Sequence, residues 1–115
     1  MTIPLHIVFR NMDSSEGIEA AIRKHTEKLE HFSEHIMRCN VTVETVGKHK
    51  QQGRLHEVRI DLTVPGTVIA IGQNQGHEDV YVAMRDAFDA LTRKLQDIAR
   101  NQRGEVKARN VPPAE

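Results

Sequence analysis

The sequence predicts an α+β domain with two layers, in which two helices cover one face of a four-stranded sheet. Two segments place apolar residues at the three- and four-residue spacing of an amphipathic helix, whereas the segments between and before them alternate or cluster apolar residues as strands do. The order along the chain is strand, helix, three strands, helix. One sheet with both helices on the same face buries the apolar stripes of both helices and the apolar sides of the strands. We therefore expect the element order βαβββα.

The first strand and the start of the first helix are predicted near the N-terminus. Residues 3–10, IPLHIVFR, alternate in the period of two that is typical of a half-buried strand. Pro4 near the start of this segment indicates an edge or entry position. The helix that follows is expected to begin at Asp13, whose three-residue spacing to Glu16 fits a capping box, with Ser14 and Ser15 as alternative caps.

Three further strands are predicted in the middle of the chain. Residues 39–46 and 55–64 are β-branched, alternating segments, and the polar, glycine-bounded stretch GKHKQQG between them indicates a hairpin. Pro65-Gly66 is a turn signal. Residues 67–72 form a short fourth strand, whose inward side cannot be assigned because four consecutive residues are apolar.

The last helix is the longest and clearest helical pattern of the chain. It is predicted over residues 77–95, with apolar residues continuing to Ile98. On its charged side, opposite charges recur every four residues and are expected to pair turn by turn: Arg85, Asp89, Arg93 and Asp97. Beyond Gly104 the pattern stops. The chain is therefore divided into a domain of residues 1–104 and a flexible C-terminal tail of residues 105–115.

Composition narrows the class of protein without naming a partner. With 115 residues the chain fits one domain, and 16 basic residues balance 16 acidic ones, so the net charge does not argue for a polyanion. Cys39 is the sole cysteine, which excludes an internal disulfide and favours a reducing cytoplasm. No segment has the pattern of a signal peptide or a membrane-spanning helix.

Catalytic, cofactor and metal sites have little support in the sequence. Cys39 at a strand start is more simply a small buried residue than a nucleophile, and no glycine-rich phosphate loop precedes either helix. His31 and His35 would chelate a metal if the first helix continued that far, but no third ligand stands at a recognisable spacing. We expect a protein that is not an enzyme. An enzyme would require a concave pocket with clustered histidines or carboxylates.

Basic residues are concentrated locally, and this distribution favours binding to a polyanion. The two helices and the hairpin turn carry clusters of lysine and arginine that would engage phosphates of structured RNA without reading bases. The scarcity of aromatic residues, 3% of the chain, argues against stacking on unpaired bases. The candidate RNA-binding residues are Arg23, Lys24 and Lys28, Lys48 and Lys50, and Arg93, Lys94, Arg100 and Arg103.

Several motifs resemble those of one family. The stretch Asp79-Val80-Tyr81-Val82-Ala83-Met84 is similar to the D-[MV]-Y-x-A-[IM] opening of the last helix in the ribosome hibernation-promoting factors. These proteins are also called ribosome-associated inhibitors, ribosomal subunit interface proteins or sigma-factor modulation proteins. Asn11 after the first strand, Lys28-Leu29-Glu30 at the end of the first helix, and the steps to Arg93 and Leu95 match as well. The resemblance extends to about Lys107.

The resemblance implies a fold similar to double-stranded RNA-binding domains and a function in the cytoplasm of a bacterium. The protein would bind 16S rRNA of the small ribosomal subunit, at the mRNA channel and the tRNA sites. It would block translation under stress or in stationary phase. The resemblance implies an rRNA-binding role for Lys28 and Arg93 because they match the family by position. For a further set the role is implied only because the residues are basic: Arg23, Lys24, Lys94, Arg100 and Arg103.

The chain departs from the family pattern at some positions. Ala90 stands where a lysine is common and Arg85 where an acid is common, so positive charge is shifted toward Arg100 and Arg103. The chain resembles the short type, which is expected to be monomeric and whose pairing of ribosomes depends on a second hibernation factor or does not occur. The alternative function is a regulatory protein-interaction module that modulates a sigma factor.

Overall fold

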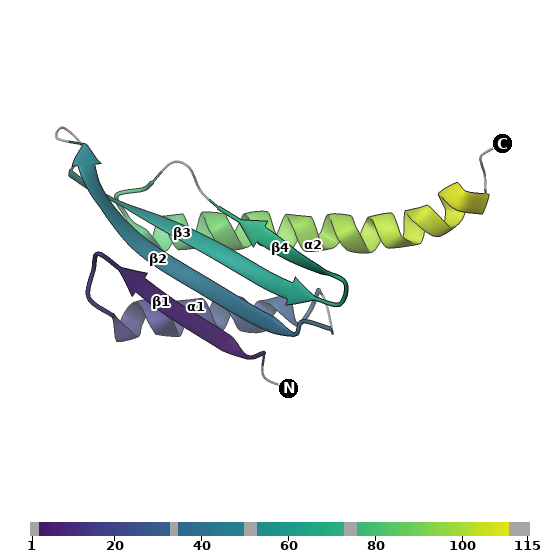
Figure 1. Cartoon of the computed structure of the whole chain (residues 1–115), viewed down its shortest axis with the longest axis horizontal. Helices are drawn as coiled ribbons and strands as arrows, with labels where there is room; N and C mark the ends of the chain where they lie inside the picture. The colour runs from purple at the N-terminus through teal and green to yellow at the C-terminus, as the bar shows by residue number, and fades with distance from the viewer. Residues whose placement is uncertain (1–2, 33–34, 50–52, 73–75, 111–115) are drawn as a thin grey trace.

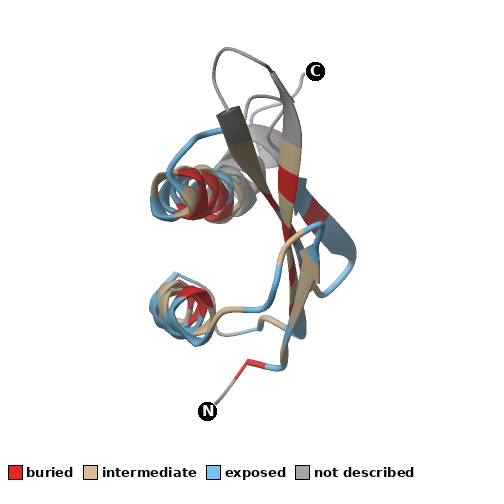
Figure 2. Cartoon of the chain, turned by 90° about the vertical axis from the view of Figure 1, so that its left-hand side faces the viewer, coloured by how far each residue is buried: buried red, intermediate tan, exposed pale blue. Residues whose placement is uncertain are grey.

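Six elements occur in the expected order in the computed structural model, which describes residues 3–32, 35–49, 53–72 and 76–110, without the side chains of 47–49, 53–54 and 101–110. Figure 1 shows the sheet with both helices behind it, and Figure 2 confirms that the helices lie on one side of the sheet. The predicted two-layer βαβββα architecture is therefore confirmed. The elements are β1 (Leu5–Arg10), α1 (Glu16–Leu29), β2 (Arg38–His49), β3 (Gly53–Val64), β4 (Thr67–Ile71) and α2 (Val80–Asn110).

The sheet has the strand order β1-β2-β3-β4. β1 pairs with β2 in parallel, because α1 carries the chain back between them, while β2, β3 and β4 form an antiparallel meander. The β3–β4 turn contains Pro65 and Gly66, and Gly66 has a φ of 88°. Proline followed by a residue with positive φ is the pattern of a tight turn in which glycine is favoured. The turn predicted at this dipeptide is confirmed.

An aliphatic core lies between the sheet and the helices. The inner sides of β2 and β3 are fully buried at Val41, Val43, Val58, Ile60 and Leu62, as the alternating pattern predicts. They pack in one cluster with the buried residues of the helices, which include Ile22, Leu29, Met84, Phe88 and Leu91. In β4, Ile69 is buried whereas 57% of Val68 is exposed. The side of β4 that carries Ile69 therefore faces the core, which the sequence pattern did not decide.

Both helices begin with a side chain that caps backbone N–H groups. The cap of α1 is Ser15, one of the two alternatives, and not Asp13: the Ser15 Oγ accepts a hydrogen bond from the Ile18 N–H at 3.3 Å. Asp79 precedes α2, and its Oδ1 accepts from the Tyr81 N–H at 2.9 Å. The Asp79-Val80-Tyr81 motif thus starts α2 by the same chemistry.

α2 is longer than the sequence predicts. It continues to Asn110, so residues 105–110 are helical rather than part of a flexible tail. A single glycine destabilises a helix by only about 1 kcal/mol relative to alanine. Gly104 therefore does not end the helix, because helix-forming residues follow it. Residues 111–115 lie outside the described residues. None of the helices described is long and apolar enough to cross a membrane.

Candidate nucleic-acid interface

The two helices lie side by side and run in the same direction, which sets the geometry of their outer surface. At their starts, a Cβ atom placed on Gly17 would lie 3.0 Å from the Tyr81 hydroxyl oxygen. Two turns further along, the rings of His25 and Phe88 stack, with centroids 4.9 Å apart and an interplanar angle of 11°. One side of α1 therefore faces α2 along its length.

His25 lies in this seam, where its protonated form is disfavoured. Burial lowers the pKa of His25 from its ordinary 6.5, and the nearby Lys28 ammonium lowers it further, whereas Asp89 opposes the shift. Lys28 follows His25 by three residues, and this helical spacing places it near the side of α1 that faces α2. Lys24 lies one turn earlier on the same face.

Several cations of the helices are exposed and have no ion pair among the described side chains. Lys24 and Lys28 of α1 and Arg93 and Lys94 of α2 are exposed, and none has a carboxylate within 4 Å among the described side chains. Arg100 is also exposed and approaches Asp97 at 3.9 Å, a pair too solvated to hold the guanidinium strongly. These cations can therefore contact phosphates without first breaking a strong ion pair.

The expected charge ladder along α2 is wrong. Arg85 approaches Asp86 at 3.7 Å, and Arg100 approaches Asp97, but among the described side chains no pair forms at the predicted four-residue steps. Exposed long side chains gain little from any one partner, so neighbouring carboxylates compete on equal terms. Among the described side chains, neither Asp89 nor Asp97 therefore holds Arg93 in an ion pair.

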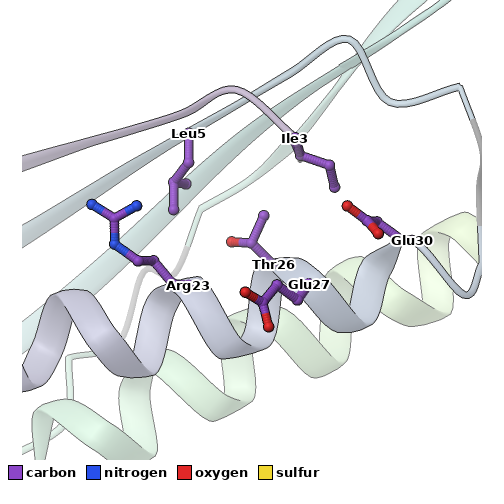
Figure 3. Close-up of a pocket in the computed structure, with 6 residues that line it drawn as sticks. All are labelled: Ile3, Leu5, Arg23, Thr26, Glu27 and Glu30. Carbon is purple, nitrogen blue, oxygen red and sulfur yellow. The ribbon is translucent and has the colours of Figure 1, made fainter. Parts of the chain in front are cut away.

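Arg23 does not belong to the surface that Lys24 and Lys28 form. Its side chain lines a pocket on the other flank of α1, between this helix and β1. Figure 3 shows the Arg23 guanidinium near Leu5 at one end of the pocket and the Glu30 carboxylate near Ile3 at the other. The one-residue step from Arg23 to Lys24 turns the side chain by about 100° around the helix, which separates the two cations.

Two of the remaining candidate residues, Lys48 and Arg103, belong to elements at opposite ends of the molecule (Figure 1). Lys48 is in β2 and Arg103 is in α2, but their side chains are not described, and Lys50 lies outside the described residues. Figure 1 shows the β2–β3 hairpin at the end where both helices begin and the last turns of α2 at the opposite end. Because the longest dimension is 57 Å, the basic residues are spread over a long surface rather than gathered in one pocket.

The histidine pair considered for a metal does not have the required helical spacing. α1 ends at Leu29, so His31 and His35 are not on one helix face. No group of three or more potential metal ligands occurs among the described residues.

The architecture defines a class of small α+β domains that is known from solved structures. The crystal structure of the Thermus thermophilus Protein Y N-terminal domain matches with a TM-score of 0.63 and 17% identity, covering 85% of this chain and 99% of that one. A ribosomal subunit interface protein from Coxiella burnetii matches with a TM-score of 0.69 and 14% identity, with the same coverage of 85% and 99%. At these identities the likeness establishes the fold.

The family follows from the sequence match. A family model described as sigma 54 modulation protein / S30EA ribosomal protein matches residues 5–103, and the chain belongs to this family. The resemblance to ribosome hibernation-promoting factors is thereby confirmed. The family is one of ribosome-associated factors and is not a known enzyme family. No curated protein sequence gives a significant match.

Proposed function

We propose that this protein silences translation by binding the small ribosomal subunit through the outer surface of its two helices. The observation that carries the proposal is a set of exposed cations on neighbouring helices that have no ion pair with any described side chain: Lys24, Lys28, Arg93 and Lys94. Lysine and arginine neutralise backbone phosphates without requiring base identity, which suits structured rRNA. Family membership supports the ribosome as the source of that RNA.

The finer proposal concerns the site and the conditions. Occupancy of 16S rRNA at the mRNA channel and tRNA sites would keep idle ribosomes from translating under stress or in stationary phase. This role needs no catalysis, cofactor or metal, and it belongs to the cytoplasm. We propose that the protein acts as a monomer, and that pairing of ribosomes, where it occurs, requires a second hibernation factor.

Co-sedimentation with purified ribosomes tests this function. The protein is expected to pellet with idle 30S subunits and 70S ribosomes at low salt and to be released as salt rises, because binding to phosphates releases counterions. Failure of the protein to co-sediment with ribosomes at low salt would contradict the proposal. In that case the description of the family as sigma 54 modulation proteins favours the second candidate, a protein-interaction module, and binding to a purified sigma factor would be measured instead.

A further inference from the structure

The outer edge of β1 is unpaired. β1 lies at one end of the strand order and pairs with β2 alone, and no other described residue pairs with it. Figure 1 shows β1 along the lower border of the sheet, with α1 behind it. Its register with β2 runs without a break from Leu5 to Arg10, so no bulge turns the edge away.

The backbone groups on this edge can be identified from the parallel ladder. The Cys39 N–H donates to the Pro4 carbonyl oxygen at 2.9 Å, so Pro4 directs its carbonyl toward β2. In a parallel pair, alternate residues direct both backbone groups to the same side. His6 and Val8 therefore bond to β2, whereas Leu5, Ile7 and Phe9 present their N–H and C=O groups at the free edge. Such a row can accept a further strand.

A pocket adjoins this edge on the helix side of the sheet. Ile3 and Leu5 form its apolar wall, and Arg23 and Glu27 of α1, with Glu30 just after the helix, form the charged wall (Figure 3). Buried Thr26, at its base, is already satisfied, because its hydroxyl donates to the Ile22 carbonyl oxygen at 2.8 Å. A side chain of an added strand that pointed toward α1 would enter this pocket.

The charge of this flank selects a basic occupant. The four- and three-residue spacing places Glu16, Glu19, Glu27 and Glu30 on the same flank as Arg23. Among the described side chains, none of these carboxylates has an ion pair within 4 Å. An arginine or lysine can pack its methylene stem on Ile3 and Leu5 and place its charge near Glu30. The same carboxylates repel nucleic acid, in contrast to Lys24 and Lys28 on the other flank.

We propose that the free edge of β1 and the pocket beside it bind an extended, basic protein segment as a fifth strand. Main-chain hydrogen bonds to Leu5, Ile7 and Phe9 would supply affinity, and the acidic flank of α1 would select arginine or lysine at alternate positions. This surface is separate from the proposed rRNA-binding surface, so it can be tested on the isolated protein without ribosomes.

The first experiment uses a blocked nine-residue peptide of alternating valine and arginine, with alternating valine and glutamate as its matched control. NMR hydrogen exchange of the full chain is measured with and without each peptide. We expect the arginine peptide to protect the amides of Leu5, Ile7 and Phe9 and to leave those of His6 and Val8, already bonded to β2, nearly unchanged. The proposal is overturned if these three amides stay unprotected at saturating peptide, or if the glutamate peptide protects them equally.

Variants separate the strand edge from the pocket. Ile7→Pro removes an N–H that points to the free edge and leaves the bonds to β2 intact, and Ile7→Ala controls for the lost side chain. We expect Ile7→Pro alone to abolish peptide binding, and Glu27→Gln with Glu30→Gln to weaken it about tenfold, as for a charge-assisted hydrogen bond. Unchanged affinity in the Glu27→Gln/Glu30→Gln protein would overturn the proposal, whatever the ribosome measurements show.

Discussion

His25 is the residue whose ionisation is tied to the packing of the two helices. Its ring is stacked on Phe88 and lies near Lys28 and Asp89. Burial, followed by the Lys28 charge, lowers the pKa of His25, so the folded protein binds its proton less readily than the unfolded chain. Protonation therefore favours unfolding.

The stability of the protein is predicted to fall as the pH drops below the ordinary pKa of histidine, about 6.5. In that window the unfolded chain takes up a proton at position 25 before the folded protein does. The fall ends below the folded-state pKa, where both states are protonated. Urea unfolding of wild type and His25→Gln at pH 7.5 and pH 5.5 measures this, and the His25→Gln protein should lose less stability. An identical loss of stability in wild type and His25→Gln would contradict a lowered pKa of His25 in the folded protein.

Leu91 tests the core at the same scale. It is fully buried in the cluster between α2 and the sheet. Leu91→Ala is expected to lower the free energy of unfolding by about 2–5 kcal/mol, because it leaves a cavity that the surrounding aliphatic side chains fill incompletely. The exposed neighbour Arg93→Ala is the control and should change stability by no more than about 0.5 kcal/mol. If Leu91→Ala and Arg93→Ala changed the free energy of unfolding equally in urea, Leu91 would not lie in the core.

Single residues were predictable where burial decides their position and unpredictable where several partners compete. The inward facing of Val58, Ile60 and Leu62 follows from alternation alone and is confirmed. The separation of Arg23 from Lys24 depends on how α1 is rotated over β1, which charge counts along the chain do not reveal. The acidic flank opposite Lys24 could have been predicted from the three- and four-residue spacing of the glutamates in and after α1.

At the scale of elements, the entry into α2 is held by a short contact with β3. His56 and His77 exchange two backbone hydrogen bonds, with the His56 N–H 2.7 Å from the His77 oxygen and the His77 N–H 3.0 Å from the His56 oxygen. Gly76 lies against this bridge, and a Cβ added there would be 2.6 Å from the Leu55 Cβ. The approach of the chain to β3 therefore requires glycine at this position.

Gly76→Ala is predicted to destabilise the protein by about 1–3 kcal/mol, because the added methyl group forces the chain away from β3. Gly72→Ala is the matched control, since a Cβ at Gly72 would meet nothing within 4 Å and the φ of Gly72 is not positive. Thermal unfolding followed by circular dichroism compares the two variants. A Gly76→Ala protein as stable as the Gly72→Ala protein would show that the contact is not maintained in solution.

Element order and type could be predicted, whereas element ends could not. Periodicity gave the six elements, but β2 and β3 extend into the polar hairpin stretch and α2 passes Gly104 to Asn110. Backbone pairing and helix propagation continue as long as a neighbouring strand or helical turn is present, even without apolar residues. The pattern of apolar residues therefore does not predict how far the strands and the helix extend.

At the scale of the whole molecule, charge is divided among three surfaces despite a net charge of zero. The outer surface of the helices has exposed cations, the flank of α1 beside β1 is acidic, and the open face of the sheet mixes both signs. Arg10, Arg38 and Arg59 lie on that open face, because they alternate with residues whose side chains face the helices. Ribosome binding through the helices therefore requires cations at this location rather than a particular total charge.

The salt dependence of 30S binding tests this requirement most directly. The dissociation constant is measured at several salt concentrations for wild type, for Arg93→Glu/Arg100→Glu/Arg103→Glu, and for Arg10→Glu/Arg38→Glu/Arg59→Glu, with circular dichroism to verify folding. Both variants change the net charge equally. The helix variant is expected to lose binding or to lower the salt slope by about two to three units, whereas the sheet variant keeps the wild-type slope. Wild-type affinity and slope in the helix variant, or equal losses in both, would contradict binding through the helices.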